Sequence, residues 1–259
     1  YENHRNRLCP LNIASLNCRS LPKFSSPETS SSFIRYLRTL SYDILCFQES
    51  HASNEAVQSM LDMKLQAKSS IWTKHCGIVS LNTSILLHPQ FITIDQRAKC
   101  CIVSHINNLF PPITLLNIYA PAQPVPRKSF YSNLLQLPMF HTLGADYMSD
   151  SISPSELTVD LFLIMGDFNY HSIMYTDDSF HSGLPNPSSI HSASATDPQL
   201  KWHQMLMLHF YNAMIAITDD DSPTFRRGNT ISTIDYVYTS SSLIPHLRSS
   251  SVDFVSPEW

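Results

Sequence analysis

Short apolar runs, separated by amphipathic stretches, recur along most of this chain. Two of these runs, residues 44–47 and 161–165, contain no polar residue and are too short to form helices by themselves. We therefore predict two strands buried on both faces, and an alternating pattern predicts a first strand within 11–18. Apolar residues at helical spacing predict helices, which we place after the N-caps Ser26 and Ser53 and over 128–137 and 200–211.

The strands expected after the second helix are short and close together in sequence. We place them at 71–73, 77–81, 91–94, 101–106 and 113–119, where the short connections predict an antiparallel meander. Later strands are expected at 214–217, 231–238 and 252–255, and the polar stretch 171–198 is expected to be a functional or disordered loop. Because no linker or repeat divides the pattern, we expect one α/β domain over residues 1–259. Its two sheets would pack together with helices outside.

Composition limits the classes of protein that remain. Hydrophobic residues make up 43% of the 259 residues and charged residues 15%, so the chain can bury a sizeable core. The net charge of −4 gives no overall basic surface for nucleic acid, so such binding would need a local patch. The six cysteines form no CxxC pair, and we expect them to be reduced and mostly buried, in a reducing compartment. No apolar run is long enough for a membrane span.

Polar residues follow the predicted buried strands at the points where these strands end. They are Asn17, Glu49, Tyr119, Asp167 and Asn169, and a further acid, Asp235, lies inside a strand rich in β-branched and aromatic residues. Each strand-end residue could instead serve as a turn residue. Taken together, carboxylate and amide oxygens suit a hard cation such as Mg²⁺, and the same set suits phosphoryl chemistry. No Gly-rich phosphate loop, HExxH or GxSxG motif is present, so kinase and serine-hydrolase functions have no support.

Five segments in order resemble motifs of the endonuclease/exonuclease/phosphatase superfamily. They are Leu16-Asn17, Ile44–Glu49, Asn117–Pro121, Gly166-Asp167-Phe168-Asn169 and Ser232–Tyr236. Within that superfamily, the basic turn Thr224–Gly228 before Ile234-Asp235-Tyr236 is similar to the apurinic-endonuclease-like domain of non-LTR retrotransposons. The resemblance covers about residues 11 to 255. It implies a four-layered α/β sandwich with two mixed, mostly antiparallel sheets packed face to face.

The resemblance also implies a function and a role for each matching residue. The expected activity is Mg²⁺-dependent phosphodiester hydrolysis, with Mn²⁺ as an alternative metal, in an endonuclease that nicks target DNA. Glu49 would hold the metal with Asn17 beside it, and Asp167 would orient or activate the attacking water. Asn169 and Tyr119 would contact the phosphate. Asp235 would orient a histidine, and Arg226 and Arg227 would bind substrate.

Two departures from the family pattern leave alternatives open. The family places a Ser-Asp-His motif just after the final strand, and no such motif is present here, so we expect the sequence to be truncated just before it. His246 precedes the last predicted strand and does not match that motif. Thr233 stands where a basic residue often precedes the strand acid. The chain could therefore be a catalytically impaired remnant that only binds nucleic acid, or a phosphatase of the same fold. The retrotransposon resemblance further implies DNA as partner, fusion to a reverse transcriptase, and a nuclear location.

Overall fold

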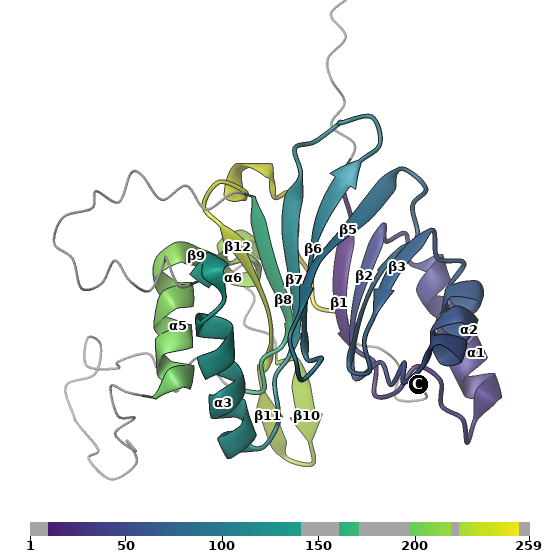
Figure 1. The fold of residues 1–259 in the computed structure, drawn as a ribbon, viewed down its shortest axis with the longest axis horizontal. Coiled ribbons are helices and arrows are strands. Elements are labelled where there is room, and N and C mark those ends of the chain that lie inside the picture. Colours follow the sequence, from purple (N-terminus) through teal and green to yellow (C-terminus); the bar gives the residue numbers. More distant parts are fainter. Residues whose placement is uncertain (1–9, 141–160, 171–196, 219–222, 254–259) are drawn as a thin grey trace, which may run out of the picture. The chain divides into compact units, whose positions relative to one another are not determined.

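The computed structural model describes residues 10–140, 161–170, 197–218 and 223–253 (Figure 1). Within the chain, two compact units can be distinguished. The first comprises residues 1–119, 160–167 and 252–259, and the second comprises residues 120–159 and 168–251. We describe each unit by itself.

The first unit contains a mixed four-stranded sheet in the order β1-β2-β4-β3. Its strands are β1 (Ile13–Asn17), β2 (Ile44–Gln48), β3 (Ser69–Trp72) and β4 (Cys76–Ser80). Strand β1 runs parallel to β2, whereas β4 is antiparallel to both β2 and β3. All five residues of β2 are buried, which confirms the prediction that the apolar run at 44–47 is a strand covered on both faces.

A second mixed sheet of the first unit contains four further strands. They are β5 (Ile85–Ile92), β6 (Ala98–His105), β7 (Ile113–Tyr119) and β8 (Phe162–Asp167). Antiparallel pairs join β5 to β6 and β6 to β7, and β7 pairs in parallel with β8. The predicted meander therefore belongs to two sheets, because β3 and β4 pair with β2 whereas β5, β6 and β7 pair with one another. Strand β5 also begins earlier than the predicted 91–94.

The two sheets of this unit pack face to face, with β1 and β2 against β8 and with β2 and β4 against β7. A polar contact joins their apolar inner faces. The Asn117 amide on β7 donates 3.0 Å hydrogen bonds to the carbonyl oxygens of Phe47 and Gly77. Its own oxygen accepts a 2.6 Å bond from Gln48 Nε2. Because all these groups are fully buried, one side chain satisfies backbone groups of the opposite sheet and sets the separation of the strands.

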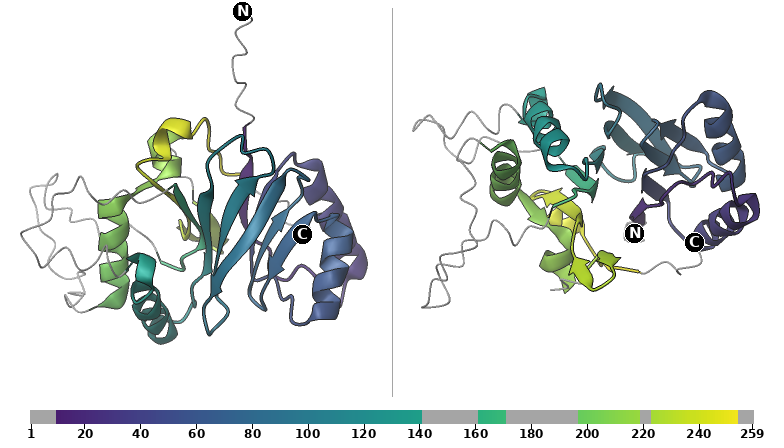
Figure 2. Two further views of the ribbon diagram at one scale, coloured as in Figure 1. Left: turned by 45° about the horizontal axis from the view of Figure 1, so that its top comes forward. Right: turned by 90° about the horizontal axis from the view of Figure 1, so that it is seen from below.

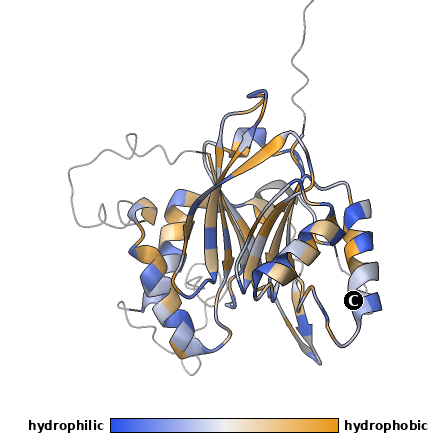
Figure 3. Cartoon of the chain, turned by 45° about the vertical axis from the view of Figure 1, so that its right-hand side comes forward, coloured by the Kyte–Doolittle hydropathy of each residue, from blue (hydrophilic) through white to orange (hydrophobic). Residues whose placement is uncertain are grey.

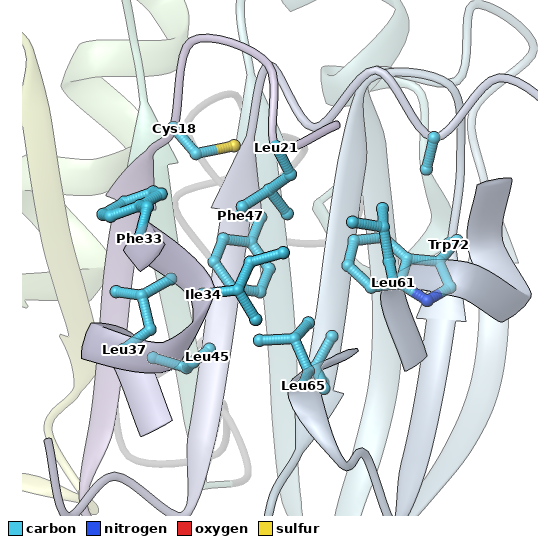
Figure 4. Packing of buried hydrophobic residues seen from close by; sticks show 12 residues of the cluster. Cys18, Leu21, Phe33, Ile34, Leu37, Leu45, Phe47, Leu61, Leu65 and Trp72 are labelled. Atoms are coloured by element: carbon cyan, nitrogen blue, oxygen red, sulfur yellow. The ribbon is translucent and has the colours of Figure 1, made fainter. Parts of the chain in front are cut away.

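Two helices, α1 (Pro27–Thr39) and α2 (Glu55–Leu65), cover the outer face of the four-stranded sheet (Figures 1 and 2). Their apolar faces pack with strand residues into one core, in which Ile34 lies beside Phe47 and Leu61 beside Trp72 (Figure 4). The outward faces of both helices carry most of their hydrophilic residues (Figure 3). Our prediction of Ser53 as N-cap is wrong. The cap is Asn54, whose side chain accepts from the backbone N–H of Val57.

The second unit contains helices α3 (Pro124–Leu135), α5 (Pro198–His209) and α6 (Ala213–Thr218), of which α3 and α5 lie side by side (Figure 2). Its strands are β9 (Phe210–Asn212), β10 (Phe225–Arg227), β11 (Thr230–Ser232) and β12 (Asp235–Ser240), followed by the 3-10 helix η4 (Ile244–His246). Strand β12 pairs antiparallel with β9, and β10 with β11. Aromatic rings fill the space between helices and strands. Trp202 stacks on Tyr131 with centroids 5.5 Å apart, and Tyr131 donates from its hydroxyl to the Phe168 carbonyl.

Three predicted elements of the second half differ from the structure. The predicted strand at 214–217 is helix α6, and the strand lies just before it as β9. The predicted strand at 231–238 is divided between β11 and β12. Residues 252 and 253 form no strand, and the rest of the strand expected at 252–255 lies outside the described residues, as does nearly all of the polar stretch 171–198.

The five cysteines in the described residues are all free thiols and all buried, as the sequence predicts. Burial raises the pKa of the Cys100 and Cys101 thiols to about 12, so both stay protonated at neutral pH. Among the helices of the described ranges, none combines the length and the apolar character that a membrane span needs.

Gly166 allows β8 to pass close to β7. Its φ is +136°, and a Cβ added there would lie 2.0 Å from the backbone oxygen of Ile118. We expect Gly166→Ala to lower the free energy of unfolding by roughly 3 kcal/mol, because backbone strain and overlap with a neighbouring strand combine. Urea unfolding measures the change.

Gly228→Ala is the matched control for this substitution. Gly228 also has a positive φ, of +59°, but an added Cβ would meet no atom within 4 Å. A loss of only about 1 kcal/mol is therefore expected there. Equal losses in the two variants would contradict the close approach of the strands at Gly166.

Candidate active site

The parallel strand pairs of the first unit bring four predicted residues to one edge. In the β1–β2 pair Asn17 lies opposite Gln48, which precedes Glu49, and in the β7–β8 pair Tyr119 lies opposite Asp167. Because parallel strands end at the same edge of a sheet, each pair delivers its polar residues together. The face-to-face packing of the sheets then brings the two pairs together.

The centre of this cluster is the side-chain amide of Asn17. Its Nδ2 lies 2.9 Å from Oε1 of Glu49 and 2.9 Å from Oδ2 of Asp167, so one amide donates to both carboxylates. Its Oδ1 accepts a 3.2 Å bond from the backbone N–H of Arg19, which fixes the orientation of the amide. Asp167 is only 2% exposed. Two carboxylates held this close in a nearly buried place repel each other and favour a shared cation or donor.

Backbone hydrogen bonds tie the turns around this cluster to one another. Ser20 donates from its backbone N–H to the Glu49 carbonyl at 2.8 Å, and Ser50 donates likewise to the His75 carbonyl at 3.1 Å. Glu49 itself has a φ of +52°. Other residues of these turns also have a positive φ, namely Arg19, Ser20, His51 and Gln96. Residues other than glycine rarely adopt this conformation, which costs about 1 kcal/mol each. Such strain concentrated around one cluster is typical of functional sites.

Tyr119 lies half-buried at the edge of this cluster. Burial, together with the negative charges of Glu49 and Asp167, raises the pKa of its hydroxyl to about 12, although Arg97 opposes this shift. The phenol is therefore protonated throughout the neutral range. It can donate a hydrogen bond to a negatively charged oxygen atom, and a phosphate oxygen is a suitable acceptor.

Two residues of the cluster were not predicted from the sequence. The guanidinium of Arg97 lies over the Tyr119 ring at 4.7 Å from its centroid, and the His75 ring is 6.0 Å from the same centroid. Burial lowers the pKa of His75, and the nearby charges of Arg97 and Lys74 lower it further, so His75 is mostly neutral at pH 7. Both residues come from turns with no distinctive local pattern, so no sequence signal indicated them.

The remaining predicted residues belong to the second unit. Asn169 has a φ of +52° and donates from Nδ2 to the Ala120 carbonyl at 2.7 Å. Asp235 begins β12, and its backbone N–H donates to the Thr224 hydroxyl at 3.0 Å. Arg226 is exposed on the β10–β11 hairpin, and Arg227 is the last residue of β10. The roles expected for these four residues stay predictions.

The donor set at the Asn17 cluster fits a divalent cation of the magnesium type. Mg²⁺ binds through one or two carboxylates and keeps several waters, and Glu49 with Asp167 supplies two carboxylates at one place. Within the described ranges, three or more His, Cys, Asp or Glu side chains do not gather into a group that could hold a metal ion. Glu49 is the residue that would hold the cation, with Asn17 and Asp167 beside it.

Asn17→Asp tests the arrangement of charges, because it changes the amide to a carboxylate of nearly the same shape. We expect the free energy of unfolding at pH 7 to fall by about 1–3 kcal/mol, since three carboxylates would then meet without a donor. The loss should shrink toward pH 4, where protonation removes the repulsion. Urea unfolding at both pH values measures it.

Asn107→Asp is the control for this variant, because Asn107 is exposed on a turn of the same unit. For this variant we expect only a small change in the free energy of unfolding, of the same size at both pH values. If Asn17→Asp behaved in the same way, the two carboxylates would not share the Asn17 amide.

Solved structures with a similar fold span most of this chain. A humanised TDP2 from D. rerio with 14 mutations superposes with a TM-score of 0.55 at 12% identity, over 89% of this chain and 83% of that one. D. rerio TDP2 in complex with a single-strand DNA product superposes with a TM-score of 0.52 at 12% identity, over 89% of this chain and 84% of that one. The mannosyl-6-phosphatase Bt3783 of Bacteroides thetaiotaomicron VPI-5482 gives 0.54 at 11% identity, over 90% and 86%. At these identities the similarity establishes the fold, which confirms the predicted α/β fold class.

A search of curated proteins returned no match. The profile of the Endonuclease/Exonuclease/phosphatase family, by contrast, matches residues 14–256, which include the Asn17 cluster and all five sequence motifs. Enzymes of this family hydrolyse phosphodiesters and phosphate esters and generally use divalent metals, commonly Mg²⁺. The chain belongs to the Endonuclease/Exonuclease/phosphatase family.

Proposed function

We propose that this protein is a divalent-metal-dependent phosphodiesterase that nicks DNA. The observation that carries the proposal is the Asn17 amide, 2.9 Å from both Glu49 and Asp167. Such a pair of carboxylates suits a hard cation, and the protonated Tyr119 hydroxyl beside it suits a phosphate oxygen.

Each residue of the cluster has a distinct task in this proposal. A bound Mg²⁺ would neutralise phosphate charge and stabilise the negative charge that develops on the leaving oxygen. Glu49 would hold this cation, and Asn17 orients both carboxylates by donating to each of them. Asp167 positions the attacking water and accepts its proton. Tyr119 donates to a non-bridging oxygen of the phosphate.

The choice of DNA as substrate rests on the sequence motifs. The basic turn before Asp235 resembles the endonuclease domains of non-LTR retrotransposons, and in the structure Arg226 is exposed on a hairpin, where it could contact a phosphate backbone. We therefore propose that the domain nicks target DNA, works in the nucleus, and is fused to a reverse transcriptase. The TDP2 structure with a DNA product is compatible with such a substrate for this fold.

A phosphatase is the second candidate. The mannosyl-6-phosphatase superposes with a TM-score of 0.54, close to the 0.55 of TDP2, so the fold does not distinguish the two activities. In that case the substrate would be a phosphate monoester of a small molecule, and Arg226 would bind this substrate and not DNA.

Nicking of a supercoiled plasmid tests the proposed activity directly. With Mg²⁺ present we expect conversion of supercoiled to open-circular plasmid, and with EDTA none, because the cation supplies charge neutralisation that the side chains lack. Sugar phosphates incubated in parallel should release no phosphate. Phosphate release without nicking would favour the phosphatase, and loss of both activities would favour a catalytically impaired remnant.

Glu49→Ala and Asp167→Ala each remove one carboxylate of the central pair. We expect each variant to lose activity at least about 100-fold, with little change in the circular dichroism spectrum, since both side chains lie at strand ends. Glu55→Ala, which removes an exposed acid from the first turn of α2, is the matched control and should retain full activity. Nicking retained by either central variant would overturn the assignment of the site.

A further inference from the structure

Arg97 occupies a fixed position in the turn just before β6, beside the candidate site. Its backbone carbonyl accepts a 2.8 Å bond from the Tyr119 N–H and a 3.3 Å bond from the Cys76 thiol. The turns on either side are cross-linked as well, because the Thr73 hydroxyl donates to the Gln96 carbonyl at 2.8 Å. Arg97 therefore belongs to the same rigid edge as Tyr119.

The side chain of Arg97 is held in place but has donors to spare. Its guanidinium lies 4.7 Å from the centroid of the Tyr119 ring, and Nη1 donates one long bond, of 3.5 Å, to the Tyr119 carbonyl. A guanidinium has five N–H donors in a planar fork, so most of them are unused by these contacts. Among the described residues the one ion pair joins Lys128 and Asp197, and no carboxylate pairs with Arg97.

The nearest acid in sequence, Asp95, is engaged elsewhere. Its Oδ1 accepts a 2.6 Å bond from the Thr93 hydroxyl and a 3.2 Å bond from the backbone N–H of Arg97. A half-buried cation without a carboxylate partner, held against an aromatic ring, is prepared for an anionic ligand.

The balance of charge at the site also requires a cation. Glu49 and Asp167 carry two negative charges, which a divalent metal would balance. A phosphodiester would bring one further negative charge, and this charge needs a positive side chain as its partner. Arg97 is the positive side chain in contact with Tyr119, and the negative charges of both carboxylates raise the pKa of the Tyr119 hydroxyl. Because the Arg97 guanidinium lies on the Tyr119 ring, its unused N–H donors lie near the place where a phosphate bound to Tyr119 would be.

We propose that Arg97 is a substrate-binding residue, whose guanidinium binds a non-bridging oxygen of the phosphate held against Tyr119. The inference rests on the proposed function in that the ligand is a phosphate ester, and it holds for a phosphodiester and a monoester alike. Arg97 acts here as a planar donor of hydrogen bonds, so its geometry matters together with its charge.

Inorganic phosphate is a probe that both candidate functions share. We would measure thermal unfolding of the full 259-residue chain in Mg²⁺, with and without 10 mM phosphate. For the wild type we expect phosphate to raise Tm by roughly 3 °C, because a ligand that binds the folded state stabilises it. Arg97→Ala should lose this rise, and Arg97→Lys should recover only part of it.

Lys74→Ala is the matched control for Arg97→Ala. Lys74 is an exposed cation on the neighbouring turn, tied by its backbone N–H to Gln96 Oε1 at 3.2 Å, and it should leave the phosphate response unchanged. An equal loss in Lys74→Ala would reveal a general effect of positive charge and would overturn the specific role of Arg97. A wild type that does not respond to phosphate, or an Arg97→Ala variant that responds fully, would overturn it too.

Kinetics with bis(4-nitrophenyl) phosphate measure KM and kcat separately. A purely structural role of Arg97 would not raise KM selectively. Arg97→Ala should raise KM about 10- to 100-fold, as expected for loss of a hydrogen bond between charged groups. Tyr119→Phe keeps the ring on which Arg97 stacks and should lower kcat more than it raises KM. A wild type that binds phosphate but cleaves no diester would refute the proposed nuclease and leave the Arg97 site standing.

Discussion

One amide group between two carboxylates is the interaction on which the rest of this site depends. Glu49 directly follows a strand of one sheet and Asp167 ends a strand of the other, and Asn17 donates to both at 2.9 Å. Placing two negative charges so close costs free energy, which hydrogen bonds and a bound cation can offset. The arrangement is therefore hard to explain by stability alone, and it is natural for chemistry on a charged phosphate.

The surrounding structure holds these carboxylates in place through buried hydrogen bonds and unusual backbone conformations. The side-chain amide of Asn117 joins the two sheets through buried hydrogen bonds. Gly166 lets β8 approach β7 closely, and Asp167 follows it at the end of β8. Glu49 adopts a left-handed conformation that its neighbours stabilise by hydrogen bonds from one turn to the next. Rigid strands with strained ends can position side chains within a fraction of an ångström, which a flexible loop cannot do.

Local pattern predicted the elements best where burial was complete. The apolar runs at β2 and β8 were predicted correctly as strands, and every residue of both strands is buried. The region 214–217 was predicted wrongly, since a short apolar segment fits a helix and a strand equally well. The N-cap was misplaced by one residue because Ser53 and Asn54 are both good caps, and only the hydrogen bond to Val57 distinguishes them.

The sequence by itself determined the order of the candidate residues: Asn17, Glu49, Tyr119 and Asp167 follow apolar segments in the order of the family motifs. Only the tertiary structure decided that one amide serves both carboxylates, because that contact joins residues 150 positions apart and depends on how the sheets pack. It also revealed Arg97, whose turn has no distinctive pattern. The position of its guanidinium on the Tyr119 ring depends on long-range pairing between strands, which local sequence does not encode.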